Sequence, residues 1–347
     1  MTSAHFLSLT PAGLYCPAGD FFVDPVRPVA RAVVTHGHSD HARAGHGAVL
    51  ATRETLAIMA IRMGEGFAAT TQALSYGETL RLGGIDVSLH PAGHVLGSAQ
   101  IRMADARAVV VASGDYKRDE DPTCAPFEPL ACDVFITEAT FGLPVFRHAR
   151  ADDEIAKLLA SLRLFPERAH LVGAYALGKA QRVAALLRRA GYDRPIYLHG
   201  AMEKLFSFYA SQGLDLGETR PVAASDRATL GGEVVICPPS AVQDLWSRKF
   251  PDPVACFASG WMRVRARARQ RGVELPLVVS DHADWDALTG TVLETHCART
   301  LVTHGEADAL VHWAKSAGLE AEPLHLLGYG EEEPETGAAS GMEPTPA

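Results

Sequence analysis

Thr35-His36-Gly37-His38-Ser39-Asp40-His41 follows directly on Ala32-Val33-Val34, an apolar run with the composition of a buried strand. Four potential metal ligands therefore fall within six residues, at the end of that strand. A tight loop there can point His36 and His38 to one side and Asp40 and His41 to the other. We expect two neighbouring clusters of imidazole nitrogen and carboxylate oxygen, which suit borderline divalent metals such as zinc. A histidine-rich surface loop with adventitious metal binding is the alternative, and ligands further along the chain argue against it.

The bulk composition describes a protein with a full core and no membrane anchor. A chain of 347 residues is long for one domain and comfortable for two, and 47% of its residues are hydrophobic. No apolar run approaches the roughly 18 residues that span a bilayer, and the N-terminus lacks a signal pattern. The six cysteines are scattered without a C-x-x-C pair, as in buried thiols. We expect a cytoplasmic protein with structural cysteines.

The charge of the chain is unevenly placed. The net charge of −9 argues only weakly against a nucleic-acid partner, because residues 331–347 carry much of the excess. This tail holds glutamates and no basic residue, and its Gly, Ala, Pro and Ser content predicts disorder. Residues 263–271, in contrast, are strongly basic.

Further acids and a histidine follow other predicted strands. His94 lies in a glycine-rich loop that can bend to aim its ring inward, and Asp115 follows an apolar strand and can bridge two metals. Glu138 follows another apolar strand. The repeated placement predicts chemistry along one edge of a sheet. Asp24 also ends a strand, and two readings stay open: it orients the ligand loop, or it forms a turn before Pro25.

The pattern changes at about residue 149, where strands begin to alternate with helices. Helices are predicted over residues 152–164, 178–189 and 201–211, and this alternation indicates a parallel sheet flanked by helices. After it, His282 and His304 again follow apolar strands, so the first sheet is expected to resume. The other histidines, His148 among them, are treated as structural or surface residues.

Five arginines follow one another at a strict spacing of two near the end of this segment. On an extended strand they would share one face, and a ladder of guanidinium groups matches a phosphate backbone. A solvated basic edge that prevents strand aggregation is the alternative. The residues are Arg263, Arg265, Arg267, Arg269 and Arg271.

With these residues in hand, the chain resembles the metallo-β-lactamase superfamily and, within it, the β-CASP nucleases. The H-x-H-x-D-H signature lies at residues 36–41, the later metal motifs match His94 and Asp115, and the β-CASP motifs match Glu138, His282 and His304. The likeness covers about residues 10–330. It implies an α/β fold: an αββα sandwich (residues 1–148 and 273–330) with an inserted β-CASP domain (149–272), followed by the acidic tail.

A narrower likeness is to the bacterial ligase-associated DNA exonucleases. It rests on Gly13-Leu14-Tyr15-Cys16-Pro17-Ala18-Gly19-Asp20 and on Gly260-Trp261-Met262-Arg263. The resemblance implies a DNA exonuclease in DNA repair that works beside an ATP-dependent DNA ligase and a helicase. We expect no C-terminal domain of the ribonuclease J type, which weakens an RNA-turnover role. A β-CASP ribonuclease in RNA 3′-end processing or turnover is the alternative.

The resemblance also implies roles for individual residues. Two divalent ions are expected, zinc by ligand type with manganese as the alternative: one held by His36, His38, His94 and Asp115, the other by Asp40, His41, Asp115 and His304. Asp40, His282 and Glu138 form the catalytic set, in which His282 protonates the leaving oxygen and Glu138 holds its ring. The arginine stripe, with Lys179 and Arg182 near a helix N-terminus, is expected to grip phosphates.

Two other classes of function fit the sequence less well. A small-molecule hydrolase of the glyoxalase or lactamase type has no need for an inserted domain, an arginine ladder or His282. A catalytically inactive nucleic-acid-binding scaffold is disfavoured because every expected ligand position carries a ligand residue.

Overall fold

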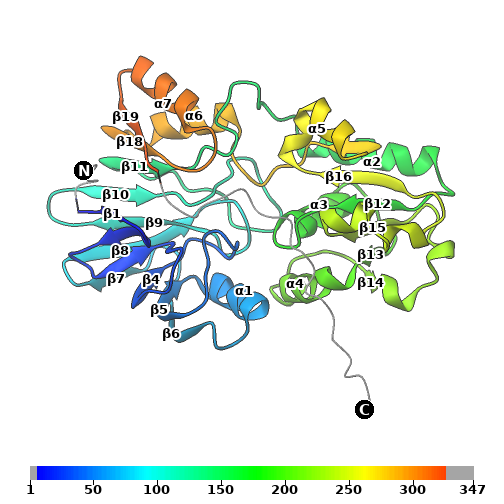
Figure 1. Ribbon diagram of the computed structural model, residues 1–347, viewed down its shortest axis with the longest axis horizontal. Coiled ribbons are helices and arrows are strands. Elements are labelled where there is room, and N and C mark those ends of the chain that lie inside the picture. Colours follow the sequence, from blue (N-terminus) through cyan, green and yellow to red (C-terminus); the bar gives the residue numbers. More distant parts are fainter. Residues whose placement is uncertain (1–5, 326–347) are drawn as a thin grey trace, which may run out of the picture.

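The computed structural model describes residues 6–325, so the acidic tail expected at 331–347 lies outside the described part of the chain. The described residues form two lobes side by side (Figure 1). The first lobe holds one six-stranded and one seven-stranded sheet, whose strands come from the chain before residue 138 and after residue 298. The second lobe holds a six-stranded sheet between residues 170 and 277, together with its helices.

The first sheet has the strand order β1-β2-β3-β4-β5-β6. Its first three strands form an antiparallel meander, and the last four run parallel to one another. Central strand β4 is short and leads straight into the loop that carries the histidine signature. The strands are β1 (Ser8–Thr10), β2 (Gly13–Cys16), β3 (Phe21–Val23), β4 (Arg31–Val33), β5 (His46–Ala51) and β6 (Ala68–Ala73).

The second sheet has the order β19-β18-β11-β10-β9-β8-β7. Strands β7 to β10 are antiparallel neighbours, whereas β10, β11, β18 and β19 run parallel. Strand β18 pairs with β11 although the whole second lobe separates them in the sequence, so the sheet does resume after the second lobe. The strands are β7 (Thr79–Leu82), β8 (Ile85–Pro91), β9 (Ala99–Ala104), β10 (Val109–Ala112), β11 (Val134–Thr137), β18 (Arg299–Val302) and β19 (Glu320–Pro323).

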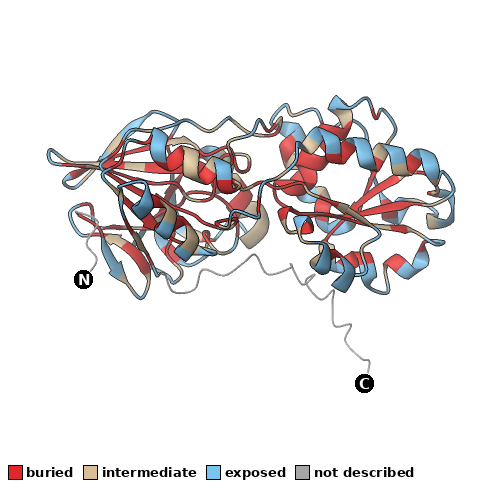
Figure 2. Cartoon of the chain, turned by 90° about the horizontal axis from the view of Figure 1, so that it is seen from above, coloured by how far each residue is buried: buried red, intermediate tan, exposed pale blue. Residues whose placement is uncertain are grey.

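The two sheets of the first lobe pack face to face with helices on both outer sides. On β11, Ile136 faces the core between the sheets, and Phe135 faces the core under α6 (Trp285–Glu294) and α7 (Ala307–Ser316). Helix α1 (Arg53–Met63) covers the outer face of the first sheet. Replacing fully buried Phe135 by Ala should cost about 3–5 kcal/mol. The layers are therefore helix, sheet, sheet, helix, with buried residues along the inner sides of the helices (Figure 2).

The sheet of the second lobe is wholly parallel and has the order β14-β13-β15-β12-β16-β17. Helices α2 (Ala151–Leu164), α3 (Lys179–Arg189) and α4 (Gly200–Ser211) pack on one face, and short 3-10 turns on the other. The α/β class is confirmed, and a parallel sheet flanked by helices is present. The strands are β12 (His170–Gly173), β13 (Ile196–Leu198), β14 (Thr219–Pro221), β15 (Val234–Cys237), β16 (Val254–Ala258) and β17 (Leu275–Leu277).

Two features differ in detail from the boundaries expected for the second lobe. Strand β17 still belongs to its sheet, so this sheet continues past the boundary expected at residue 272. The hydrophobic core under α3 and α4 also includes Ile58 of α1, with Leu96 packed against it. The two lobes therefore share one continuous apolar contact.

The extended arginine ladder is not present. Arg263 ends a 3-10 turn, η5 (Gly260–Arg263), and the next residues form helix α5 (Arg265–Gln270). Arg and Ala are strong helix formers, and on a helix residues two apart point about 200° away from each other. The prediction that all five arginines share one face was therefore wrong. Arg267 instead lies 3.9 Å above the Trp261 ring, while Arg271 lies 5.2 Å above the Phe257 ring.

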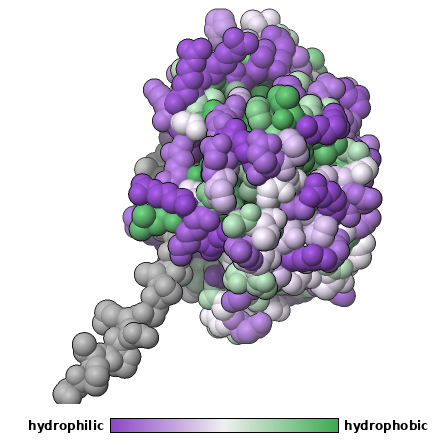
Figure 3. All heavy atoms as spheres, turned by 90° about the vertical axis from the view of Figure 1, so that its right-hand side faces the viewer, coloured by the Kyte–Doolittle hydropathy of each residue, from purple (hydrophilic) through white to green (hydrophobic). Residues whose placement is uncertain are grey.

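The remaining bulk expectations concern thiols and surface. All six cysteines are free thiols and five of them are buried. The end of the second lobe that faces away from the first is mainly hydrophilic, with hydrophobic side chains in smaller groups (Figure 3). No helix within residues 6–325 has the length and apolar character to cross a membrane.

Candidate metal centre

The predicted ligands meet at one edge of the sandwich, on loops that follow separate strands. The loop after β4 carries His36, His38 and His41, whereas His94 follows β8 and Asp115 follows β10. His304 follows β18 in the same way, and Glu138 follows β11. His282 lies on the loop after β17 of the second lobe's sheet. These loops come together because the carboxyl ends of neighbouring parallel strands open on the same edge.

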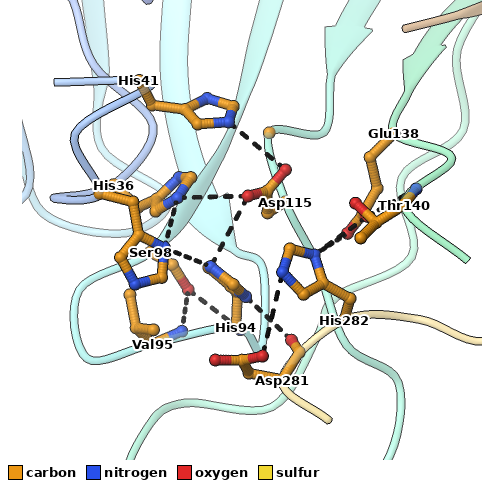
Figure 4. A network of polar contacts seen from close by, with 12 residues as sticks. His36, His41, His94, Val95, Ser98, Asp115, Glu138, Thr140, Asp281 and His282 are labelled. Carbon is orange, nitrogen blue, oxygen red and sulfur yellow. Dashed lines mark hydrogen bonds and ion pairs between the residues drawn. The ribbon is translucent and has the colours of Figure 1, made fainter. Parts of the chain in front are cut away.

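Four of these residues form a first cluster in which single donor atoms converge (Figure 4). His38 Nδ1 lies 3.1 Å from His36 Nε2 and 2.9 Å from His94 Nε2. Asp115 Oδ2 lies 3.4 Å from His36 Nε2 and 3.8 Å from His94 Nε2. Ligands about 2.0–2.1 Å from a tetrahedral zinc ion lie about 3.4 Å from one another. The cluster therefore has the donors and the separations of a tetrahedral site.

A second cluster uses the other oxygen of Asp115. Its Oδ1 lies 3.4 Å from His41 Nε2, and the ring of His304 stacks on that of His41 with centroids 4.9 Å apart. Asp40 Oδ2 lies 3.8 Å from His41 Nε2, at the margin of this cluster. One carboxylate thus faces both clusters, which is the arrangement that a bridging ligand requires.

In His38 and His94, the ring nitrogen that points away from the cluster contacts a backbone carbonyl oxygen. His38 Nε2 lies 3.3 Å from the Leu177 carbonyl, and His94 Nδ1 lies 2.8 Å from the Asp281 carbonyl. A carbonyl oxygen can only accept, so the hydrogen sits on these far nitrogens and the near nitrogens present lone pairs to the cluster. Such outer contacts orient ligand histidines in metal proteins.

Asp24 holds the ring of His41 directly and that of His36 through Thr35. It accepts hydrogen bonds from the Thr35 amide (2.8 Å) and hydroxyl (2.6 Å), and its Oδ2 lies 2.7 Å from His41 Nδ1. Because the Thr35 hydroxyl donates to Asp24, its oxygen accepts from His36 Nδ1 at 3.0 Å. Of the two readings left open for Asp24, the loop-orienting one is confirmed.

Three of the ligand histidines have lowered pKa values, whereas the pKa of His41 is raised. Burial, followed by a neighbouring histidine charge, lowers the pKa of His94 and of His304 to about 3 and holds the pKa of His36 well below its usual value. Burial opposes charge on His41 as well, but Asp115 and Asp40 outweigh it and raise the His41 pKa well above its usual value. A divalent cation would compensate this carboxylate charge in place of that proton.

His282 also has a raised pKa, and its main partner is a carboxylate outside the two clusters. Its Nδ1 lies 3.0 Å from Glu138 Oε2, and its ring centroid lies 4.7 Å from that of His94. Burial acts to lower the His282 pKa, but the charge and hydrogen bond of Glu138, with Asp115 and Asp281 behind them, raise it to about 10. These carboxylates favour the protonated ring, and the free nitrogen of His282, Nε2, lies 3.9 Å from Asp281 Oδ1 (Figure 4).

Lys179 and Arg182 do not present their charges to solvent, as phosphate binding would require. Their exposed fractions are 3% and 1%, because Lys179 pairs with Asp281 at 2.6 Å and Arg182 with Asp121 at 3.4 Å. The phosphate-gripping role expected from a helix N-terminus was wrong for both. The sequence analysis also missed Asp281. Its one signal in the sequence is that it directly precedes His282.

The donor set fits two divalent metal ions. The first cluster offers three imidazole nitrogens and one carboxylate oxygen, and the second offers imidazole and carboxylate groups around the shared Asp115. Nitrogen-rich sites of this kind suit zinc, and carboxylate-containing ones also accept manganese.

Comparison with known proteins gives partial likenesses. No family model matches the chain. A probable DNA ligase of Opitutus terrae is 29% identical over 314 residues, covering 89% of this chain and 30% of that protein. Ribonuclease TTHA0252 of Thermus thermophilus is 29% identical over 220 residues, covering 54% of this chain and 50% of that protein. The chain thus spans at most half the length of these two relatives.

Two further comparisons bear on family and fold. The endoribonuclease ysh1 of Aspergillus fumigatus is 31% identical over 143 residues, 40% of this chain and 16% of that protein. A crystal structure of a protein of unknown function from Enterococcus faecalis shares the fold, with a TM-score of 0.55, 12% identity and coverage of 78% and 74% of the two chains. The nuclease relatives support the resemblance to the β-CASP nucleases of the metallo-β-lactamase superfamily.

Proposed function

We propose that this chain is a two-metal phosphodiesterase that hydrolyses nucleic acid, and that its substrate is DNA. The observation that carries the proposal is the pair of donor clusters sharing Asp115, with His282 directly beside them and held by Glu138. Two bound divalent ions would activate the attacking water and stabilise the negative charge of the phosphate in the transition state. We assign the ligand roles to His36, His38, His94, Asp115, Asp40, His41 and His304.

The chain's own residues supply the proton transfer. As water adds to phosphorus and the bond to the leaving 3′ or 5′ oxygen breaks, His282 passes its Nε2 proton to that oxygen. Glu138 contributes by holding Nδ1 and stabilising the imidazolium form. The products are a phosphate monoester end and an alcohol end, so the atoms of one water are consumed.

Substrate binding falls to the surface beside η5 and α5. Arg263, Arg265 and Arg269 are exposed there, and Trp261, which is partly exposed, contacts Phe141 at a centroid distance of 4.8 Å. The ring centroids of Phe141 and His282 are in turn 6.1 Å apart. This basic and aromatic surface therefore begins about one nucleotide's length from the proton donor. Guanidinium groups and aromatic rings together bind single strands without regard to sequence. We assign this surface to that strand, and residues 151–277 to the inserted β-CASP domain.

The likeness to the probable DNA ligase over 89% of this chain favours DNA over RNA. A segment of this kind inside a ligase-named protein supports an exonuclease that trims ends in DNA repair beside an ATP-dependent ligase, with a helicase as a further partner by family resemblance. The second candidate is an RNA-processing nuclease, which the ribonuclease relatives favour.

Matched end-labelled single-stranded DNA and RNA, incubated with zinc or manganese, test the proposal. Stepwise shortening of DNA that disappears in Asp115→Asn supports a DNA exonuclease and reveals its polarity. Cleavage confined to RNA moves the same chemistry into RNA processing. Cleavage of neither substrate by metal-loaded protein overturns the assignment.

A further inference from the structure

We propose that Lys179 and Arg182, at the start of α3 in the second lobe, are positioning residues that keep His282 aimed at the leaving oxygen. The inference rests on the proposed phosphodiesterase function and adds to it. It means that the catalytic centre, although built on the first lobe, is complete only when the second lobe is docked against it.

The two cations hold the segment that carries His282. Lys179 Nζ lies 2.6 Å from Asp281 Oδ1, and Arg182 Nη1 donates to the Ser280 carbonyl at 2.7 Å. Arg182 is also anchored by Asp121 of the first lobe at 3.4 Å. All of these side chains are almost completely buried, so the contacts are shielded from solvent and salt. Residues 280–282 are therefore fixed from the second lobe on one side and by Glu138 on the other.

The chain just before α3 touches the metal loops in the same way. The Leu177 carbonyl accepts from His38 Nε2 at 3.3 Å. Gly178 has a φ of 83°, and a Cβ there would lie only 2.3 Å from Val95 Cγ1, next to His94. The close approach of this turn needs a glycine. The start of α3 thus contacts the loops of His38, His94 and His282 at once.

Lys179 has a specific electrostatic effect on His282. The His282 ring lies between two carboxylates, with Glu138 3.0 Å from Nδ1 and Asp281 Oδ1 3.9 Å from Nε2 (Figure 4). If Asp281 accepted the Nε2 proton, that proton would be directed away from the substrate. The ammonium of Lys179 engages the same Oδ1 at 2.6 Å, so Nε2–H stays available to the leaving oxygen.

A buried ion pair is weak evidence for stability, because well-packed apolar residues often serve as well. Because the start of α3 touches three catalytic loops and its two buried cations hold residues 280–281, we assign these charges a role in fixing geometry. Removing Lys179 leaves the Asp281 carboxylate buried without its partner and free to pull the His282 ring. Loss of an outer contact of this kind typically costs roughly 10- to 100-fold in activity.

The test compares two phosphodiesters that differ in their need for an acid. DNA has a basic alkoxide leaving group, whereas thymidine 5′-(p-nitrophenyl phosphate) releases a weakly basic phenolate that departs without a proton. For Lys179→Met we expect kcat on DNA to fall roughly 10- to 100-fold with KM and metal content unchanged, and the p-nitrophenyl ester to be cleaved at nearly the wild-type rate. Lys179→Arg should restore most of the DNA activity. An equal loss on both substrates overturns the proposal.

The matched control is Arg188→Met in the same helix. Arg188 bonds to the carbonyls of Leu216, Tyr192, Arg194 and Glu218 within the second lobe, far along α3 from the site, so its loss tests stability alone. If Lys179→Met does not fold, the double variant Lys179→Met/Asp281→Asn removes the buried charge as well. We expect that variant to fold and to keep most of the DNA activity; failure to cleave DNA while cleaving the ester contradicts the charge argument.

A crystal structure of the variant separates this inference from the proposed function. In Lys179→Met, His282 Nε2 should move from 3.9 Å to within hydrogen-bond distance of Asp281. An unmoved ring overturns the positioning role whatever the activity. Wild-type protein that cleaves neither DNA nor RNA overturns the proposed function but not the shift of the ring.

Discussion

His282 Nδ1 lies 3.0 Å from Glu138 Oε2, and the two residues come from loops 144 positions apart in the sequence. The contact leaves Nε2 as the only nitrogen of His282 that can serve the reaction. We predict that His282→Ala lowers the rate of DNA cleavage by roughly 100- to 10,000-fold, the usual contribution of a general acid. Metal content, measured by elemental analysis, should be unchanged. His312→Ala, at an exposed position of α7, is the control, and a fully active His282→Ala protein contradicts the assigned role.

Asp24 touches no substrate and should still control metal affinity. It holds His41 directly and His36 through Thr35, so Asp24→Asn weakens the orientation of one ligand in each cluster. We expect metal affinity to drop by roughly 10- to 100-fold, measured by competition with a chelating dye. Asp20→Asn is the control, since Asp20 lies near the same strand but is exposed, and its polar side-chain contacts within residues 6–325 are with Tyr15 and Arg31. Equal affinities of the two variants contradict the prediction.

The sequence predicts the site far better than it predicts the substrate surface. Strand-end placement of His36, His94, Asp115 and His304 follows from local patterns, because each strand ends where an apolar run ends. The extended strand predicted for residues 263–271 is wrong because alternation indicates a strand, whereas Arg and Ala favour a helix. The burial of Lys179 depends on contacts with a loop about 100 residues away, which no local pattern contains.

We predict that protonation of His148 lowers the free energy of unfolding at acid pH. Burial, with Lys117 nearby, lowers its pKa from 6.5 to about 4, so the folded state prefers the neutral ring. Its stabilising effect is complete above the unfolded-state pKa of 6.5 and is lost as the pH falls toward 4. Between pH 7.5 and pH 5 this amounts to about 2 kcal/mol. Urea unfolding of metal-free wild type and His148→Gln at both pH values should show that extra loss in wild type only; parallel losses contradict it.

We predict that a nucleobase stacks on Trp261, close to the proton donor His282. Arg267 lies 3.9 Å above the Trp261 ring, and Phe141 and Phe146 support it at centroid distances of 4.8 and 5.1 Å. Stacking of one base on an aromatic side chain is worth about 1–3 kcal/mol, so Trp261→Ala should weaken single-stranded DNA binding roughly 5- to 150-fold. The chain offers a matched control in Trp246, which carries Arg227 at 5.3 Å but packs against a different hydrophobic cluster of the second lobe. Fluorescence anisotropy with metal-loaded Asp115→Asn or with the metal-free protein measures binding without cleavage. Equal weakening by Trp246→Ala would show that the effect is one of stability and not of contact with a base.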